Sequence, residues 1–427
     1  MLAMLRYLDE SQWWDAGRLV EHQLRQADTL LAHALISSPF CADRLRGYAG
    51  SAPLTMERWR ELPLLTRADI QEAGDTLHCR HLPPEHGDIF STTTSGSTGQ
   101  PLTTRGSGLT QFFWNVLTLR DHHWHKRSME GTHAIIRVFD FPAEKGGVER
   151  SDWGAPFNQI YTTGASALFS ILADVSKQAQ WLRRVNPLYL LTYPSNLKAL
   201  LEIFEHDGEV LPHLRQVRTI GETLASDVVD ACRGVLGVPV VDLYSTQEVG
   251  YIAMQCPDGG CYHSQSENLL VEILDESGNP CGPGQVGQVV VTALHNFASP
   301  LIRYAIGDFA EVGEPCSCGR GLPAFRRILG RRRNLLTLPT GERFWPIFGT
   351  RTFREISPAI RQYQVIQTGL DRLEVRLVTD EALSADIERQ LRELVVRTVG
   401  HPFGVNLVYP AEIRMVAGKH EEFKSEI

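Results

Sequence analysis

Short apolar segments alternate with helical patterns between residues 131 and 243, and this alternation limits the folds that are open to the chain. The strand candidates are residues 134–139, 187–192, 217–220 and 238–243. Ser195 and Ser226 stand where N-caps of the intervening helices are expected. Apolar strands joined through helices are typical of a parallel sheet that is covered on both faces. We therefore predict an α/β fold whose ligands bind at the carboxyl ends of the strands.

The rest of the chain predicts additional regions. Residues 11–48 carry apolar side chains at helical spacing and predict a packed N-terminal helical region. Residues 269–312 contain strand candidates separated by turn residues, which predicts a mostly antiparallel β subdomain. Beyond the basic run 326–333, strand-like segments 364–367, 373–378, 405–408 and 412–416 flank a helical pattern at 385–399. We interpret the run as a boundary between a large N-terminal domain, 1–332, and a small α+β C-terminal domain, 333–427.

Composition excludes several classes of protein. The chain has 427 residues, 43% of them hydrophobic, and a net charge of −8, which is typical of a globular protein with more than one core. An acidic chain with one basic run does not predict nucleic-acid binding. We see no apolar run long enough to span a membrane and no signal pattern in residues 1–10, so we expect a cytoplasmic protein. There the eight cysteines are expected to be reduced thiols or metal ligands.

Three polar stretches fall where a ligand would bind in the predicted sheet. Residues 91–101 concentrate hydroxyls and glycines, which suit phosphate binding because backbone N–H groups can converge on an anion. The lysine of a Walker loop is missing, and a flexible surface loop fits the composition of this stretch equally well. The stretches 221–223 and 244–250 each follow a strand candidate and would lie at the same edge of the sheet.

Three histidines, His122, His123 and His125, stand near the end of a predicted helix at 106–125. A metal site would need further ligands, and no cysteine lies nearby in the sequence. We expect these histidines to be exposed at the helix terminus.

Several motifs in this order resemble those of the adenylate-forming enzymes. They are Ser95-Gly-Ser-Thr-Gly99, Tyr244-Ser-Thr-Gln-Glu248, Arg303-Tyr-Ala-Ile-Gly-Asp308, Gly330-Arg331 and Gly418-Lys419. Within that superfamily the chain is most similar to the phenylacetate–CoA ligase-like branch, on the basis of Leu62-Pro-Leu-Leu-Thr-Arg67, the stretch 300–308 and Cys316-Ser-Cys-Gly-Arg320. The resemblance runs from about residue 60 to the end of the chain.

The resemblance implies a large domain with parallel α/β sheets and a β subdomain, followed by a small mobile domain. It also implies a two-step reaction, in which a carboxylate attacks the α-phosphate of ATP and a thiol then displaces AMP from the acyl-AMP. The implied ATP-binding residues are Thr94, Ser95, Gly96, Ser97, Thr98, Gly99, Gly221, Glu222, Thr223, Asp242, Tyr244, Ser245, Thr246, Asp308 and Arg331. Glu248 would bind magnesium, which prefers oxygen ligands, and Lys419 would offset charge in the transition state.

Each implied role has a simpler structural alternative. Glu248 could cap a helix, Asp308 could be a turn residue, and Lys419 could be a solvated charge of the tail. Lys424 is a second candidate for the catalytic lysine, but Lys419 follows a glycine, as the family's lysine often does.

The sequence departs from the family pattern at two places. Leu102 and Thr103 stand where the wider superfamily often has a lysine, and Arg333 stands at a hinge position that is usually acidic. The second departure bears on the second step of the reaction, because the small domain must rotate there between the two steps.

Cysteines and a histidine also suggest a structural zinc site. Cys256, His263, Cys316 and Cys318 would supply a tetrahedral set, with Cys261 as a substitute, and some relatives carry metal at comparable positions. A set of free surface thiols explains these residues equally well.

The sequence thus predicts an ATP-dependent carboxylate–CoA ligase (AMP-forming) for an aromatic or similar compact acid. ATP, magnesium and coenzyme A would be its cofactors and co-substrates, and a homodimer is compatible with the sequence. Two alternatives stay open: transfer of the acyl group to a carrier protein or an amine, and a catalytically idle acyl- or nucleotide-binding relative.

Overall fold

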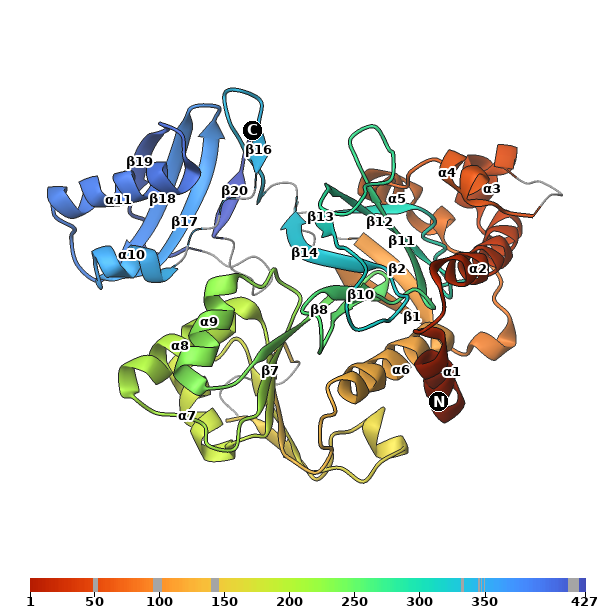
Figure 1. The fold of residues 1–427 in the computed structure, drawn as a ribbon, viewed down its shortest axis with the longest axis horizontal. Coiled ribbons are helices and arrows are strands. Elements are labelled where there is room, and N and C mark those ends of the chain that lie inside the picture. The colour runs from red at the N-terminus through yellow and green to blue at the C-terminus, as the bar shows by residue number, and fades with distance from the viewer. Residues whose placement is uncertain are drawn as a thin grey trace. The chain divides into compact units, whose positions relative to one another are not determined.

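The structure is a computed structural model that describes residues 1–48, 53–94, 102–139, 146–331, 334–344, 346, 348, 350–413 and 422–427. The chain forms two compact units (Figure 1). Unit 1 comprises Met1–Thr223 and Cys232–Ile328, and unit 2 comprises Leu224–Ala231 and Leu329–Ile427. The predicted domain boundary after residue 332 lies close to the division between Ile328 and Leu329, and it stays a prediction.

The N-terminal region of unit 1 is helical, as predicted. Its α-helices are α1 (Leu2–Ser11), α2 (Ala16–Ser37), α3 (Pro39–Arg44), α4 (Met56–Glu61) and α5 (Arg67–Ala73). The helical pattern breaks before α2, where the Asp15 side chain accepts the N–H of Arg18 and caps that helix. Leu30 of α2 and Trp59 of α4 are completely buried in one cluster with Ile302, so these helices pack against the later β region.

One long sheet forms the centre of unit 1. Among the described residues it contains twelve strands in the order β11-β12-β13-β14-β10-β9-β8-β7-β6-β3-β5-β4. The strands are β3 (His133–Arg137), β4 (Val148–Arg150), β5 (Ser166–Ser170), β6 (Tyr189–Thr192), β7 (Gln216–Ile220), β8 (Val240–Thr246), β9 (Gly250–Gln255), β10 (Tyr262–Ser264), β11 (Leu269–Leu274), β12 (Val286–Ala293), β13 (Tyr304–Val312) and β14 (Ala324–Arg331).

The part of this sheet from β8 to β5 is parallel. Strand β3 pairs parallel with β5 and β6, β6 with β7, and β7 with β8. Helix α6 (Gly108–Trp124) packs on one face, where Val116 and Leu119 join Tyr189 in a buried cluster. Helices α7 (Val175–Val185) and α8 (Pro194–Asp207) lie side by side and are drawn on the opposite side of these strands (Figure 1). The predicted α/β class is confirmed.

The predicted β subdomain is antiparallel, but it continues the same sheet. Strands β11, β12 and β13 pair antiparallel, and β9 and β10 join this part to β8. Val289, Tyr304 and Ile252 meet in one buried cluster that extends across this region. A shared core explains why the β region is continuous with the α/β part.

A separate two-stranded hairpin carries the first polar stretch. Strands β1 (Ile89–Thr94) and β2 (Leu102–Ser107) pair antiparallel with Thr94 opposite Leu102. Helix α6 follows β2 directly, so the hairpin connects the polar stretch to the helix that covers the parallel strands.

Unit 2 is an α+β unit. Its elements are β15 (Leu336–Thr337), β16 (Arg343–Phe344), α10 (Thr350–Ile356), β17 (Ile360–Gly369), β18 (Arg372–Thr379), α11 (Ala385–Val399), β19 (Gly404–Val408) and β20 (Phe423–Ser425); α9 (Ser226–Leu236) is divided between the units. The expected strand at 412–416 is wrong at Glu412 and Ile413, which are not in a strand, and the rest lies outside the described residues. Instead β20 pairs parallel with β17, because Phe423 is buried in the core of this unit.

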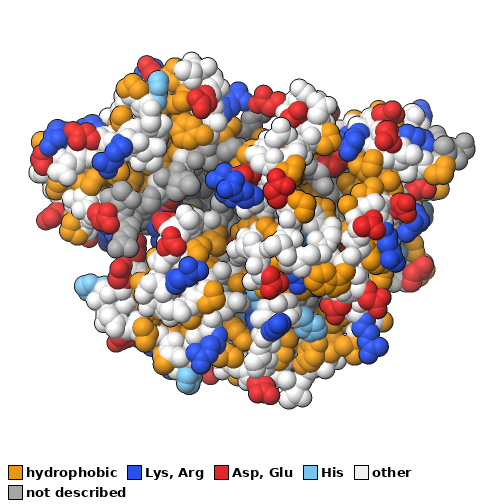
Figure 2. All heavy atoms as spheres, viewed as in Figure 1, with side chains coloured by type: hydrophobic (Ala, Val, Ile, Leu, Met, Phe, Trp, Pro, Cys, Tyr) orange, Lys and Arg blue, Asp and Glu red, His pale blue; other side chains and the backbone are white. Residues whose placement is uncertain are grey.

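The described helices include none that is long and apolar enough to cross a membrane. Acidic and basic side chains are interspersed over the face of the molecule drawn in Figure 2.

Candidate active site

The carboxyl ends of the central strands bring several predicted residues together. Tyr244 lies on β8, and its hydroxyl donates a hydrogen bond of 2.8 Å to Oδ2 of Asp308 on β13. Both side chains are buried, with residue exposures of 8% and 7%. The bond joins residues that are far apart in the sequence and were predicted to bind the adenine and the ribose of one nucleotide.

Gly221 follows β7 with φ of +82°, a conformation that favours glycine. The next residue, Glu222, accepts the backbone N–H of Ser195 at 2.8 Å and its hydroxyl at 3.0 Å. The prediction that Ser195 is an N-cap is therefore wrong, because Ser195 lies inside α8. The N-cap of this helix is Tyr193, whose side chain makes no capping hydrogen bond. The Glu222 carboxylate, from the loop after β7, stabilises this helix terminus instead. Thr223 is exposed, and the loop therefore ends at the surface.

Asp242 lies on β8 two residues before Tyr244 and is 3% exposed. Its carboxyl accepts hydrogen bonds from the hydroxyls of Thr219 (2.5 Å) and Tyr262 (2.9 Å). Burial raises its pKa to about 6, although these hydrogen bonds oppose the shift. The Asp242 carboxyl is therefore used inside the protein, where it connects β8 to its neighbours. Ser245 and Thr246 follow at the half-buried end of the strand.

Glu248 lies in the tight turn between β8 and β9, so the alternative that it caps a helix is wrong. Its side chain is 8% exposed, and Oε1 is 3.8 Å from Nη1 of Arg67, at the start of α5. The Glu248 carboxylate therefore lies close to a guanidinium at this edge of the sheet.

Arg303 is an important residue that motif reasoning left without a role. It is 3% exposed, has φ of +51°, and its guanidinium binds both carboxylate oxygens of Glu272, at 3.0 and 3.1 Å. The same guanidinium donates to the carbonyl oxygens of Arg60 and Leu62, at the connector before α5. This buried ion pair fixes the start of β13, the strand that carries Asp308. Its place in the motif before Asp308 was the signal in the sequence.

The other predicted residues lie at the ends of strands, on β20, or outside the described residues. Thr94 ends β1, opposite Leu102. Ser95, Gly96, Ser97, Thr98, Gly99 and Lys419 lie outside the described residues. In unit 2, Arg331 is the last residue of β14, and Lys424 lies on β20 with its ammonium paired to Glu426.

His122 is buried and His123 and His125 are half-buried, contrary to the prediction that these histidines are exposed. His122 is completely buried, and its ring contacts the rings of His133 and Phe157. His125 lies with Nε2 3.8 Å from Oδ1 of Asp121, a carboxylate that also pairs with Arg127 at 2.6 Å. The helix end is covered by the sheet and by residues around 153–157, which its local sequence did not reveal.

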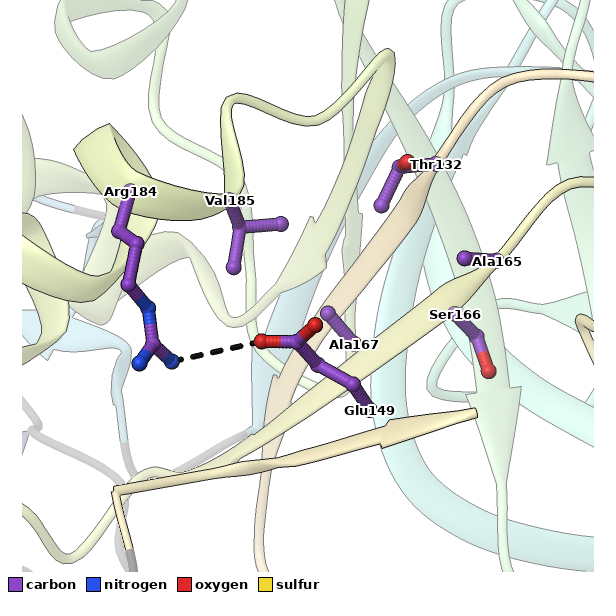
Figure 3. A pocket seen from close by; sticks show the side chains of 7 residues that line it. All are labelled: Thr132, Glu149, Ala165, Ser166, Ala167, Arg184 and Val185. Atoms are coloured by element: carbon purple, nitrogen blue, oxygen red, sulfur yellow. Dashed lines mark hydrogen bonds and ion pairs between the residues drawn. The ribbon is translucent and has the colours of Figure 1, made fainter. Parts of the chain in front are cut away.

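A pocket of about 310 Å³ lies away from these residues (Figure 3). Thr132, which precedes β3, and Ser166, which begins β5, line it together with the ion pair of Glu149 and Arg184 at 3.4 Å. It therefore lies at the amino ends of the parallel strands, and the predicted site lies at their carboxyl ends.

A cluster of cysteines and one histidine lies at the turn between β9 and β10. The ligand atoms of Cys256, Cys261, His263 and Cys316 are all within 4.8 Å of one another. The sulfur of Cys318 is 3.3 Å from Nε2 of His263, so both proposed sets of ligands lie within reach of one point. Thiolates and imidazole at such spacing suit tetrahedral zinc.

The groups around this cluster orient its ligands as a metal requires. Nδ1 of His263 is 3.2 Å from the carbonyl oxygen of Leu322, which accepts its proton and leaves Nε2 for a metal. The N–H groups of Gly259 and Arg320 donate to the sulfurs of Cys256 and Cys318, at 3.3 and 3.4 Å. Burial lowers the pKa of His263 to about 4, and a neutral imidazole is the form that binds metal. The residues present therefore fit a structural zinc ion.

Comparison with known proteins agrees with this architecture. No protein-family model matches the sequence. A phenylacetate–coenzyme A ligase of Thermus thermophilus is 26% identical over 278 residues, which cover 57% of this chain and 61% of that relative, less than two thirds of its length. The phenylacetate–coenzyme A ligase of Pseudomonas putida is 24% identical over 348 residues, 78% of this chain and 74% of the relative.

The fold is that of adenylate-forming CoA ligases. A 2-hydroxyisobutyryl-CoA ligase, solved in the postadenylation state with an acyl-AMP, superposes with a TM-score of 0.75 at 18% identity and covers 97% of this chain and 91% of its own. Together with the sequence relatives, this confirms the resemblance to the phenylacetate–CoA ligase-like branch of that superfamily.

Proposed function

We propose that the chain is an AMP-forming carboxylate–CoA ligase. The carboxylate oxygen of an aromatic or similarly compact acid attacks the α-phosphate of ATP, giving acyl-AMP and pyrophosphate, and the thiol of coenzyme A then displaces AMP. The observation that carries this proposal is the bond between Tyr244 and Asp308, because it joins a flat aromatic ring to a carboxylate that can accept ribose hydroxyls.

The nucleotide would lie along the carboxyl edge of β7 and β8. Thr94 and residues 95–99 would hold the β- and γ-phosphates, and Arg331 would approach the ribose or the phosphates. The Gly221 turn, with Glu222 and Thr223, and residues 242–246 would form the wall at the adenine, on which Tyr244 stacks. The carboxyls of Glu222 and Asp242 are already hydrogen-bonded within the protein, so we assign these two residues to the shape of the wall.

Glu248 is the proposed magnesium ligand. Its carboxylate is fixed in a turn beside Tyr244 and Thr246, and carboxylate and phosphate oxygens are the ligands that Mg²⁺ prefers. Bound magnesium would neutralise phosphate charge, and Arg67, 3.8 Å away, would help to position the Glu248 side chain.

We assign the catalytic lysine to Lys419, in a mobile C-terminal domain formed by residues 333–427. A lysine near the α-phosphate would stabilise the negative charge that grows in the transition state. Lys424 is the weaker candidate, because its ammonium is paired with Glu426.

The cysteine cluster is proposed to bind one structural zinc ion. Zinc would connect the β9–β10 turn to the loop that precedes β14 and would take no part in the reaction. Cys256, His263 and Cys316 belong to both candidate sets, and Cys261 and Cys318 compete for the fourth position. Reduced thiols of this kind fit the cytoplasm, where we propose that the protein works.

Product analysis tests the proposed reaction. The full chain is incubated with ATP, Mg²⁺, a panel of aryl and short acyl acids, and coenzyme A, and products are identified by mass spectrometry. We expect AMP and an acyl-CoA in equal amounts with one group of acids. If the acyl group passes only to a carrier protein or an amine, that molecule and not coenzyme A is the acceptor. ATP binding without any product would favour a catalytically idle relative.

A further inference from the structure

The N-terminal segment, residues 1–15, lies directly against the loop that carries Cys316 and Cys318. The N–H of Gly321 donates to the carbonyl oxygen of Gln12 at 2.9 Å. A Cβ atom at Gly321 would lie 1.7 Å from the carbonyl oxygen of Trp14, so only glycine permits this approach. The backbone of the cysteine loop and that of the turn before α2 are therefore in direct contact.

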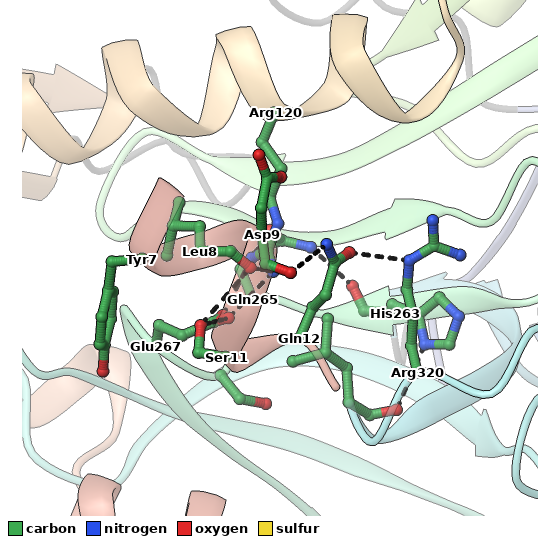
Figure 4. A network of polar contacts seen from close by, with 12 residues as sticks. Tyr7, Leu8, Asp9, Ser11, Gln12, Arg120, His263, Gln265, Glu267 and Arg320 are labelled. Carbon is green, nitrogen blue, oxygen red and sulfur yellow. Dashed lines mark hydrogen bonds and ion pairs between the residues drawn. The ribbon is translucent and has the colours of Figure 1, made fainter. Parts of the chain in front are cut away.

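Arg320 contacts both the cysteine cluster and the N-terminal segment, and Figure 4 shows its bond to Gln12. Its Nε donates to Oε1 of Gln12 at 2.9 Å, and its Nη1 is 3.8 Å from the sulfur of Cys256. The guanidinium carbon also lies 5.2 Å from the ring of Trp13. A guanidinium has donors in fixed directions, so a shift of the cysteine loop would change its bond to Gln12 as well.

A second connection runs through Trp124, at the end of α6. Its Nε1 donates to the same oxygen of Gln12, at 2.9 Å, and its ring lies edge-on to His263 with centroids 5.9 Å apart. Gln12 is 5% exposed, and its Oε1 thus accepts two buried donors that both adjoin predicted metal ligands.

The segment also has an attachment that is independent of the cysteines. Ser11 donates to Glu267 at 2.6 Å, Glu267 pairs with Arg120 at 2.9 Å, and Arg120 donates to the carbonyl oxygen of Leu8 at 3.1 Å. These groups are buried, and none of these three bonds is made to a proposed metal ligand. Loss of the cysteine-side contacts should therefore loosen the segment and leave it folded.

We propose that metal binding at the cysteine cluster and docking of residues 1–15 stabilise each other, with Arg320 and Gln12 as the positioning residues that couple them. This inference rests on the proposed zinc site. Because coupling between two equilibria is reciprocal, the factor by which metal protects the segment must equal the factor by which the docked segment raises metal affinity.

Hydrogen exchange measures the first half of this coupling. In the full chain we expect removal of zinc by a chelator to speed exchange of the α1 amides about tenfold, while amides of α11 in unit 2 are unchanged. The variant Arg320→Gln should speed the same α1 amides with zinc still bound. Arg326→Gln is the matched control, because the guanidinium of Arg326 pairs with Glu311 on β13.

Zinc competition with a chromogenic chelator measures the second half. Gln12→Ala should raise the zinc dissociation constant by the factor found for α1 exchange. Gln23→Ala should leave it unchanged, because Gln23 is also a buried glutamine but donates to the carbonyl oxygens of Ser266 and Leu269. Purified protein that binds no zinc overturns both the zinc site and the coupling. Bound zinc with unchanged α1 exchange, or with equal affinity in the Gln12 variant, overturns the coupling alone.

Discussion

The hydroxyl of Tyr244 on β8 donates to the carboxylate of Asp308 on β13 at 2.8 Å, with both side chains buried. These strands belong to the parallel and antiparallel halves of the sheet, so the bond sets the position of one half against the other at the proposed nucleotide site. A carboxylate held in this way can accept hydrogen bonds from the hydroxyls of a ribose.

Tyr244→Phe keeps the ring that would stack on adenine and removes only this donor. A hydrogen bond to a charged group contributes about 1.5–3 kcal/mol, so we expect the KM for ATP to rise by roughly tenfold or more. Steady-state kinetics with varied ATP would measure it. Tyr189→Phe is the control, because its hydroxyl accepts the N–H of Ser128 and it starts β6 at the other end of the strands. An unchanged KM in the Tyr244 variant would remove Asp308 from nucleotide binding.

Glu248→Gln preserves the size of the side chain and removes its charge. If this carboxylate holds magnesium, activity should fall on the order of 100-fold, and part of it should return at high Mg²⁺. The magnesium dependence of the overall reaction would be compared with that of Glu314→Gln, an exposed carboxylate in unit 1. Equal magnesium dependence in the two variants would contradict the assignment.

Gly259→Ala tests the geometry of the cysteine cluster. A Cβ at this position would lie 2.3 Å from the sulfur of Cys316, a distance that real contacts do not reach, so the sulfur must move. We expect less zinc per chain after dialysis than in the native protein, as measured by atomic emission. Gly282→Ala should retain the native amount, since its Cβ would meet only Oε1 of Gln285 at 3.6 Å. Full zinc content in the Gly259 variant would mean that Cys316 is not a ligand.

The buried histidines predict that stability falls with acidification. Burial lowers the pKa of His125 to about 4, and it lowers those of His122 and His133 well below the usual 6.5. Between pH 6.5 and 4 the unfolded chain therefore binds protons that the folded chain does not, so the stabilisation is complete above 6.5 and is lost as pH falls. Each histidine should contribute about 1 kcal/mol of loss by pH 5.5.

Urea unfolding at pH 7.5 and 5.5 measures this loss, and His125→Gln should make it smaller. The pKa of Asp121 is about 2, because Arg127 and Arg218 outweigh its burial, so this carboxyl does not titrate in the same range. A free energy of unfolding that is equal at the two pH values would contradict the buried, neutral state.

Local patterns predicted the parallel strands β3, β6, β7 and β8 but missed β5. The segments 187–192 and 217–220 correspond to β6 and β7 within two residues at each end, because continuous apolar runs leave few alternatives. The strand β20 was missed, since its burial depends on Phe423 packing against the distant β17, and a polar tail gives no local signal of that contact.

The residues of the candidate site were predictable where a motif carries the chemistry. They were less predictable where tertiary contacts determine the partners and the burial of a side chain. The motifs placed Tyr244 and Asp308 together in function, but only the fold brings them within 2.8 Å. Arg303 and Asp242 depend on partners from other strands, Glu272 and Tyr262, and the burial of these charges could not be read from their neighbours in sequence.

Carboxylate-dependent exchange of pyrophosphate into ATP tests the central claim most directly. It would be measured on a panel of aryl and short acyl acids, with the native chain, Lys419→Ala and Lys424→Ala. We predict exchange with one group of acids, its loss in the Lys419 variant and its retention in the Lys424 variant. Retention is expected because the ammonium of Lys424 in the native chain is paired with Glu426. Exchange that survives the loss of Lys419 would move the catalytic role elsewhere. No exchange with any acid, in a protein that binds ATP, would contradict adenylation itself.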